Sequence, residues 1–157
     1  MAQIENRHDL NRRELMTLAG AGVLAVTVLP LRSGRADLPA MQARLDELVA
    51  GRAMQEGRIT FDVPQIAENG ATVPVTIEVQ SPMTADDHVT ALHILSERNP
   101  VPQVASFHFS PRSGRALVST RIRLAESQRI HALAEMSDGS LVTGAREVQV
   151  TIGGCGG

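Results

Sequence analysis

The stretch Val73-Pro74-Val75-Thr76-Ile77-Glu78-Val79 places a branched apolar residue at every second position. Side chains of a β-strand point alternately to the two faces of a sheet, so this period of two predicts a strand with one buried face. Proline cannot donate a backbone hydrogen bond to a neighbouring strand, and Pro74 therefore predicts an edge strand or a bulge.

Six further runs of the chain predict strands by apolar residues at alternate positions or by a short apolar stretch. They cover residues 59–63, 89–96, 104–109, 116–123, 130–136 and 148–152. Turn residues such as Asn69-Gly70 and Ser137-Asp138-Gly139 separate them. Seven short strands at this spacing predict a mainly β chain, folded as an immunoglobulin-like antiparallel β-sandwich.

A short helix is expected ahead of the strands. Asp37 can cap its first turn, Pro39 suits that turn, and Gly51 follows its end. Between them, apolar residues recur at helical spacing, at Met41, Leu45, Leu48 and Val49. We expect residues 37–152 to form one domain, a β-sandwich with an N-terminal helix.

The first 36 residues have the pattern of an export signal. Arg12 and Arg13 precede an apolar run from Leu15 to Leu29, which is shorter than the roughly 20 residues that cross a bilayer. Small residues follow at Gly34 and Ala36, as signal peptidases require. Residues 1–36 therefore predict a twin-arginine signal peptide, cleaved after Ala36, and a periplasmic mature protein with no stable membrane anchor. An uncleaved membrane anchor or a buried core helix is the alternative.

Charge and composition argue against a nucleic-acid partner. Five of the 15 arginines and three of the 17 acidic residues lie in residues 1–36, which leaves a mature chain with 10 basic and 14 acidic residues. The chain has no lysine, no tryptophan and no tyrosine. Nucleic-acid binding normally needs a basic surface and aromatic rings for stacking.

The single cysteine lies in the C-terminal sequence Gly153-Gly154-Cys155-Gly156-Gly157. Glycines offer no side chain for a core and restrict the backbone least, so residues 153–157 predict a flexible arm that presents a thiol. A lone cysteine in an exported protein either pairs with another molecule or stays free and reactive. Cys155 is not predicted to be catalytic, because a cysteine nucleophile needs a fixed oxyanion site.

The histidines of the mature chain do not indicate a metal site. His88, His93, His108 and His131 show no metal-ligand spacing, and His93 and His108 lie inside apolar runs, as structural histidines do. No catalytic or metal-ligating residue is predicted, although a cysteine and a histidine that are distant in sequence can meet in space.

The chain resembles the SoxY family, the sulfur-carrier subunits of the periplasmic thiosulfate-oxidising (Sox) system. The resemblance rests on the Gly153–Gly157 tail, on the twin-arginine signal and on sequence blocks spread over the mature chain. These blocks are residues 64–70, 73–75, 81–83, 99–100, 119–125 and 148–151.

The resemblance implies a non-catalytic carrier that binds no cofactor of its own. Cys155 would hold sulfur intermediates of thiosulfate oxidation and present them to partner enzymes. The implied partners are a SoxZ-like subunit that forms a heterodimer, a haem-containing thiosulfate-conjugating enzyme, a sulfate-releasing hydrolase and, where the pathway includes one, a sulfane dehydrogenase.

Three other readings of the cysteine and the glycines stay open. A ubiquitin-like sulfur carrier would use a C-terminal Gly-Gly carboxylate, but it needs cytosolic activation. A periplasmic interaction or assembly module would use the lone cysteine for an intermolecular disulfide. A thiol oxidoreductase would need a Cys-x-x-Cys pair, which the chain lacks.

Overall fold

The computed structural model describes residues 38–152 of the chain. The predicted signal peptide, with Arg12 and Arg13, and the predicted arm at 153–157 lie outside the described residues. The elements are α2 (Leu38–Val49), β1 (Met54–Glu56), β2 (Ile59–Asp62), β3 (Ile66–Ala67), β4 (Val73–Val79), β5 (Val89–Ser96), β6 (Gln103–His108), the 3₁₀ turn η2 (Pro111–Ser113), β7 (Ala116–Ile122), β8 (Gln128–Met136) and β9 (Leu141–Val150).

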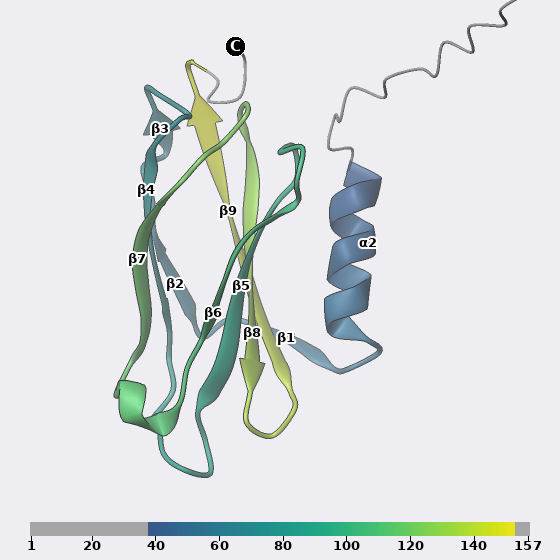
Figure 1. Ribbon diagram of the computed structural model, residues 1–157, viewed down its shortest axis with the longest axis vertical. Coiled ribbons are helices and arrows are strands. Elements are labelled where there is room, and N and C mark those ends of the chain that lie inside the picture. The colour runs from purple at the N-terminus through teal and green to yellow at the C-terminus, as the bar shows by residue number, and fades with distance from the viewer. Residues whose placement is uncertain (1–37, 153–157) are drawn as a thin grey trace, which may run out of the picture. The chain divides into compact units, whose positions relative to one another are not determined.

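The strands form two sheets that face each other across one apolar core (Figure 1). The larger sheet has the order β1-β9-β8-β5-β6, with β3 also pairing with β9, and the smaller sheet has the order β2-β4-β7. The predicted β-sandwich with a short N-terminal helix is therefore confirmed.

The core follows directly from the alternation in the sequence. Val73, Val75, Ile77 and Val79 of β4 are all buried, while Pro74 between them is exposed. The facing strands of the larger sheet supply their own alternate residues, including Leu92, Ile94, Ile130, Ala132, Ala134, Val142 and Val148. Burial of these side chains supplies the main stabilisation of the sandwich.

Pro74 lies in a central strand, but at a position where only one side of the strand has a neighbour. β4 is the middle strand of the smaller sheet, so it is not an edge strand as a whole. However, β2 ends at Asp62, opposite Thr76, and Pro74 therefore pairs only with Arg121 of β7. Its missing N–H costs no ladder hydrogen bond on the open side.

Two short strands were not predicted, and they pair differently from the rest. β1 and β3 each run parallel to β9, so the larger sheet is mixed at this edge, whereas all the other strand pairs are antiparallel as predicted. β9 also begins at Leu141 and not at 148. Residues 145–147 are exposed, so this half of β9 carries no strict apolar alternation that could reveal it.

The helix α2 lies beside the larger sheet, on the side away from the smaller one (Figure 1), and it contacts β5. Met41 of the helix is buried, as are Leu95, Leu133 and Leu141, which lie outside the main core cluster. The predicted helix is confirmed from Leu38 to Val49, with Pro39 in its first turn; Asp37 lies outside the described residues.

A chain of polar contacts links the helix and the segment after it to the outer face of the larger sheet. Arg44 donates to Gln103, which donates to Ser106, and the Ser106 hydroxyl lies 2.8 Å from Nδ1 of His93. Nε2 of His93 lies 3.2 Å from Glu135, and Glu135 lies 3.2 Å from Arg52. Arg52 also donates to the carbonyl of Leu48 at the end of the helix.

The guanidinium of Arg52, followed by the ring of His93, lowers the pKa of Glu135 from its ordinary value of 4.5, against an opposing effect of burial. A carboxyl group whose pKa is lowered by folding stabilises the protein above its unfolded-state pKa and loses that contribution as the pH falls through its folded pKa. The contact between Glu135 and Arg52 is therefore expected to stabilise the protein at neutral pH and to lose this effect as the pH falls through the lowered pKa of Glu135.

Replacing Glu135 by Gln should destabilise the protein by about 1 kcal/mol at pH 7, because the charge-assisted contact to Arg52 is lost. The difference from wild type should be smaller at a second, acidic pH, because the carboxyl group of Glu135 takes up a proton as the pH falls through its lowered pKa. Urea unfolding of both proteins at the two pH values measures this. An equal difference at both pH values would contradict the role given to the ionised carboxylate.

Candidate functional site

The segment that leads to Cys155 is fixed at one end of the sandwich. After β9, the N–H of Thr151 donates to the carbonyl of Ala67 at 3.0 Å, and its hydroxyl donates to the carbonyl of Glu68 at 2.8 Å. The carbonyl of Ile152 accepts a hydrogen bond from Gly70 at 2.8 Å. The chain is thus held by the β3–β4 segment up to its last described residue.

Cys155 and the four glycines Gly153, Gly154, Gly156 and Gly157 lie outside the described residues. Cys155 is the third residue after Ile152, and an extended chain covers at most roughly 10 Å over that length. Any group that reacts with the thiol must therefore come close to this end of the sandwich, which we call the arm end.

Asn99 is a buried polar residue that holds the loops of the arm end together. Its side-chain amide donates to the carbonyl of Arg123 at 2.7 Å, and its oxygen accepts from the N–H of Ala125 at 2.9 Å. Gln128, also buried, donates to the same oxygen at 3.0 Å. The loop between β5 and β6 is thereby tied to the loop between β7 and β8.

The β7–β8 loop is in turn tied to the segment that carries the arm. Leu124 donates its N–H to the carbonyl of Gly70, which itself binds Ile152. The hydroxyl of Ser127 accepts from the N–H of Val150 at 2.8 Å. The four segments of the arm end therefore form one hydrogen-bonded unit.

Replacing Asn99 by Ala should destabilise the fold by about 2–4 kcal/mol, because buried Gln128 and the part-buried backbone groups of Arg123 and Ala125 lose their hydrogen bonds. Chemical denaturation measures the effect, with Asn69→Ala as a control in an exposed turn that makes one local hydrogen bond to Ala71. A loss for Asn99→Ala no larger than that of the control would show that the buried network contributes little.

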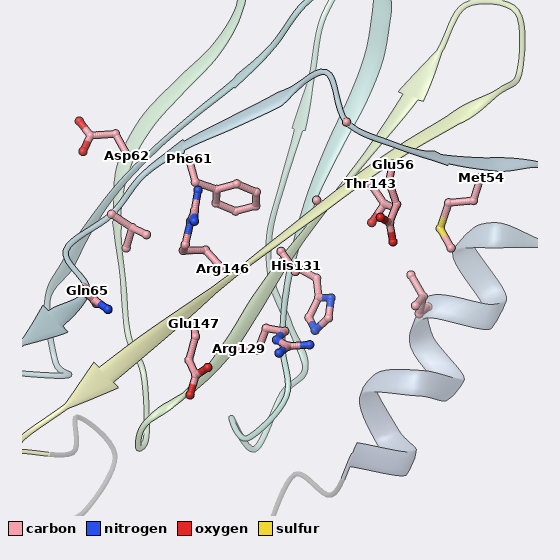
Figure 2. Close-up of a pocket in the computed structure, with 15 residues that line it drawn as sticks. Met54, Glu56, Phe61, Asp62, Gln65, Arg129, His131, Thr143, Arg146 and Glu147 are labelled. Carbon is pink, nitrogen blue, oxygen red and sulfur yellow. The ribbon is translucent and has the colours of Figure 1, made fainter.

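A second candidate is a groove along the free side of β9, with a volume of about 910 Å³. β1 ends opposite Thr143 and β3 begins opposite Gln149, so residues 144–148 have no strand partner on that side within the described part of the chain. Figure 2 shows Phe61 and Arg146 on one side of β9 and Arg129, His131 and Glu147 on the other.

The interruption arises because the chain crosses to the other sheet between β1 and β3. β2 pairs with β4, and there Ile59 and Phe61 pack directly over Gly144 of β9. A Cβ atom at Gly144 would lie only 3.1 Å from the ring of Phe61, so glycine permits this close crossing. The groove can accept an extended peptide or a polar ligand, but its charges are mixed and do not select one.

Two of the four histidines of the described residues take part in structural contacts. Nε2 of His131 lies 2.9 Å from Glu97, and His93 belongs to the polar chain beneath the helix. Within residues 38–152, no three or more His, Cys, Asp or Glu side chains are grouped so that they could hold a metal ion. Among these residues, no helix is long and apolar enough to cross a membrane.

Sequence reasoning singled out Cys155 but missed what surrounds the arm end. Asn99, Gln128 and the segment around Ile66 meet only in the folded chain. The blocks at 64–70 and 119–125 resemble a family, but nothing in their composition shows that they lie at the arm end.

Comparison with solved structures gives a close relative and several distant ones. The sulfur carrier protein SoxY from Chlorobium limicola f thiosulfatophilum is 33% identical, with a TM-score of 0.61, and the match covers 73% of this chain and 98% of that one. The search of curated proteins gave no match.

Superoxide reductases share the fold alone. A neelaredoxin variant from Ignicoccus hospitalis is 16% identical, with a TM-score of 0.53 and coverage of 66% of this chain and 85% of that chain. A putative superoxide reductase from Thermotoga maritima is 17% identical, with a TM-score of 0.51 and coverage of 63% and 86%.

The family model described as "Sulfur oxidation protein SoxY" matches residues 45–155. The match runs from the middle of α2 through every strand and ends at Cys155. It covers more than half of the chain, and the chain therefore belongs to the SoxY family of sulfur oxidation proteins.

Proposed function

We propose that this protein is a covalent sulfur carrier, whose Cys155 holds the intermediates of thiosulfate oxidation and presents them to separate enzymes. The observation that carries the proposal is the family match, which extends to Cys155 itself. The sandwich supports it by fixing the chain up to Ile152, three residues before the thiol.

The chemistry requires a thiolate and an external electron acceptor. The Cys155 thiolate and thiosulfate together lose two electrons as the new S–S bond forms, and a haem-containing partner enzyme accepts them. The product is a cysteine S-thiosulfonate. Water then cleaves its S–SO₃ bond at a hydrolase, which releases sulfate and leaves a persulfide on Cys155.

The carrier itself needs no catalytic group for these steps. Arg146 is the nearest basic residue to Cys155 in sequence. A free cysteine has a pKa of about 8.5, so only a few per cent of the thiol groups are ionised at neutral pH. We infer that the partner enzymes activate the thiol, that this chain binds no cofactor, and that a SoxZ-like subunit completes the carrier as a heterodimer.

The proposal is tested by intact mass and peptide mapping after the mature protein is incubated with thiosulfate and the host's periplasmic extract. We expect a thiosulfonate or persulfide adduct on the C-terminal peptide that a reducing agent removes. Protein that carries only a disulfide to another polypeptide would contradict carriage and favour the assembly-module alternative.

We also propose that the protein reaches the periplasm through the twin-arginine route. Replacing Arg12 and Arg13 together by Lys should leave the precursor in the cytoplasm, because that export machinery reads the arginine pair. Cell fractionation measures the distribution, and N-terminal sequencing of the wild-type periplasmic protein should begin at Asp37. Periplasmic protein that still began at Met1 would refute cleavage.

A further inference from the structure

The arm end carries the most exposed large apolar side chains of the described residues. Ile66, Val101 and Ile152 have exposed fractions of 57%, 67% and 68%. Ile66 lies in β3, which pairs with the end of β9, and Val101 lies in the loop that Asn99 anchors. Exposed apolar side chains that gather at one end of a domain indicate a contact surface.

Two arginines without an ion-pair partner among residues 38–152 lie beside Val101. A hollow of about 510 Å³ next to it is lined by apolar Val104 and Ile122 and by the arginines Arg121 and Arg123. Both arginines are on exposed positions, and neither forms an ion pair with any residue between 38 and 152. A partner surface that fits here would combine apolar and acidic side chains.

The length of the arm restricts which molecule can use this surface. Cys155 lies at most roughly 10 Å of chain beyond Ile152, and Ile152 is hydrogen-bonded to the domain. An active site that receives the thiol must therefore open within that distance of the arm end. The protein surface around the opening then faces the arm end, where Ile66, Val101 and Ile152 are exposed.

We propose that Ile66, Val101, Ile152 and Arg123 form a docking rim for the active-site openings of the enzymes that act on Cys155. The openings would present apolar residues edged by carboxylates. This inference rests on the proposed carrier function and adds to it that the domain, and not the arm alone, is recognised. Recognition through the rim lowers the KM for the carrier, whereas the chemistry at the sulfur is unaffected.

The test compares rim variants with matched variants elsewhere on the surface. Val101→Asp and Ile152→Asp place a carboxylate on the rim, and Leu117→Asp places one at an exposed apolar position of β7. Arg123→Glu is matched by Arg112→Glu in η2, which is also exposed. Each mature variant, co-expressed with its partner subunit, is loaded with thiosulfate by the host's haem enzyme and separately labelled with N-ethylmaleimide.

We expect each rim variant to raise the KM for loading at least about 10-fold while kcat at saturation and labelling by N-ethylmaleimide stay at wild-type values. The two control variants should load like wild type. Rim variants that load normally, control variants that are equally impaired, or rim variants that lose their partner subunit would each overturn the proposal. Failure of wild-type Cys155 to accept any adduct would instead overturn the carrier function.

Discussion

Replacing Cys155 by Ser should abolish thiosulfate oxidation by the reconstituted system. A serine hydroxyl stays protonated at neutral pH and cannot form the S–S bond that retains the intermediate. Because Cys155 is the only cysteine of the chain, no second thiol can substitute for it. The measurement is thiosulfate-dependent reduction of the electron acceptor with the purified partner enzymes, and activity should fall to that of a mixture without the carrier.

The loss in Cys155→Ser must be separated from damage to the fold. Residue 155 follows the last residue that the structure describes, and the described domain has its core among residues that end at Val150. The thermal transition should therefore match wild type. Wild-type protein alkylated at Cys155 serves as a chemical control and should be equally inactive. Normal turnover by Cys155→Ser would rule out covalent carriage at this position.

The strands of the core could be predicted because buried apolar residues occupy every second position of their sequences. β4 and β5 have the predicted bounds, and β7 differs only at its end. Val73, Val75, Ile77 and Val79 show why: each faces the core, and each intervening side chain faces away from it. In such strands, one residue class at every second position leaves little choice of register.

The strand segments that the sequence did not predict depend on contacts that leave no local pattern. β1 is exposed along its whole length, and β3 has two residues, so neither carries a periodic signal. Both form because they pair with the free edge of β9. The first half of β9 was missed for the related reason that its middle residues line a groove and not the core.

One part of the candidate site can be recognised in the sequence, and another part cannot. Cys155 stands out in the sequence, since it is unique and lies among glycines. The hydrogen bonds of Asn99, and the meeting of Ile66, Val101 and Ile152 at one end, depend on the three-dimensional pairing of distant loops. The sequence of each loop alone does not reveal which distant loops it meets.

Bulk next to the thiol should impair loading nearly as strongly as removal of the thiol. Gly154→Val and Gly156→Val each add a β-branched side chain beside Cys155, which restricts the backbone and widens the segment. If the glycines allow the tip to enter a narrow active site, enzymatic loading should fall by about 100-fold, because a small misplacement at the reacting atoms carries a cost of that order.

The decisive comparison is between enzymatic loading and labelling by a small reagent in the same variant. N-ethylmaleimide needs only an exposed thiol, so both variants should react at the wild-type rate, and their thermal transitions should match wild type. An arm that only displays the thiol would show no loss of loading. A thiol made less reactive by its neighbours would lose loading and labelling together. Loss of loading alone is the expected result, because an enzyme that encloses the sulfur must admit its neighbouring residues as well.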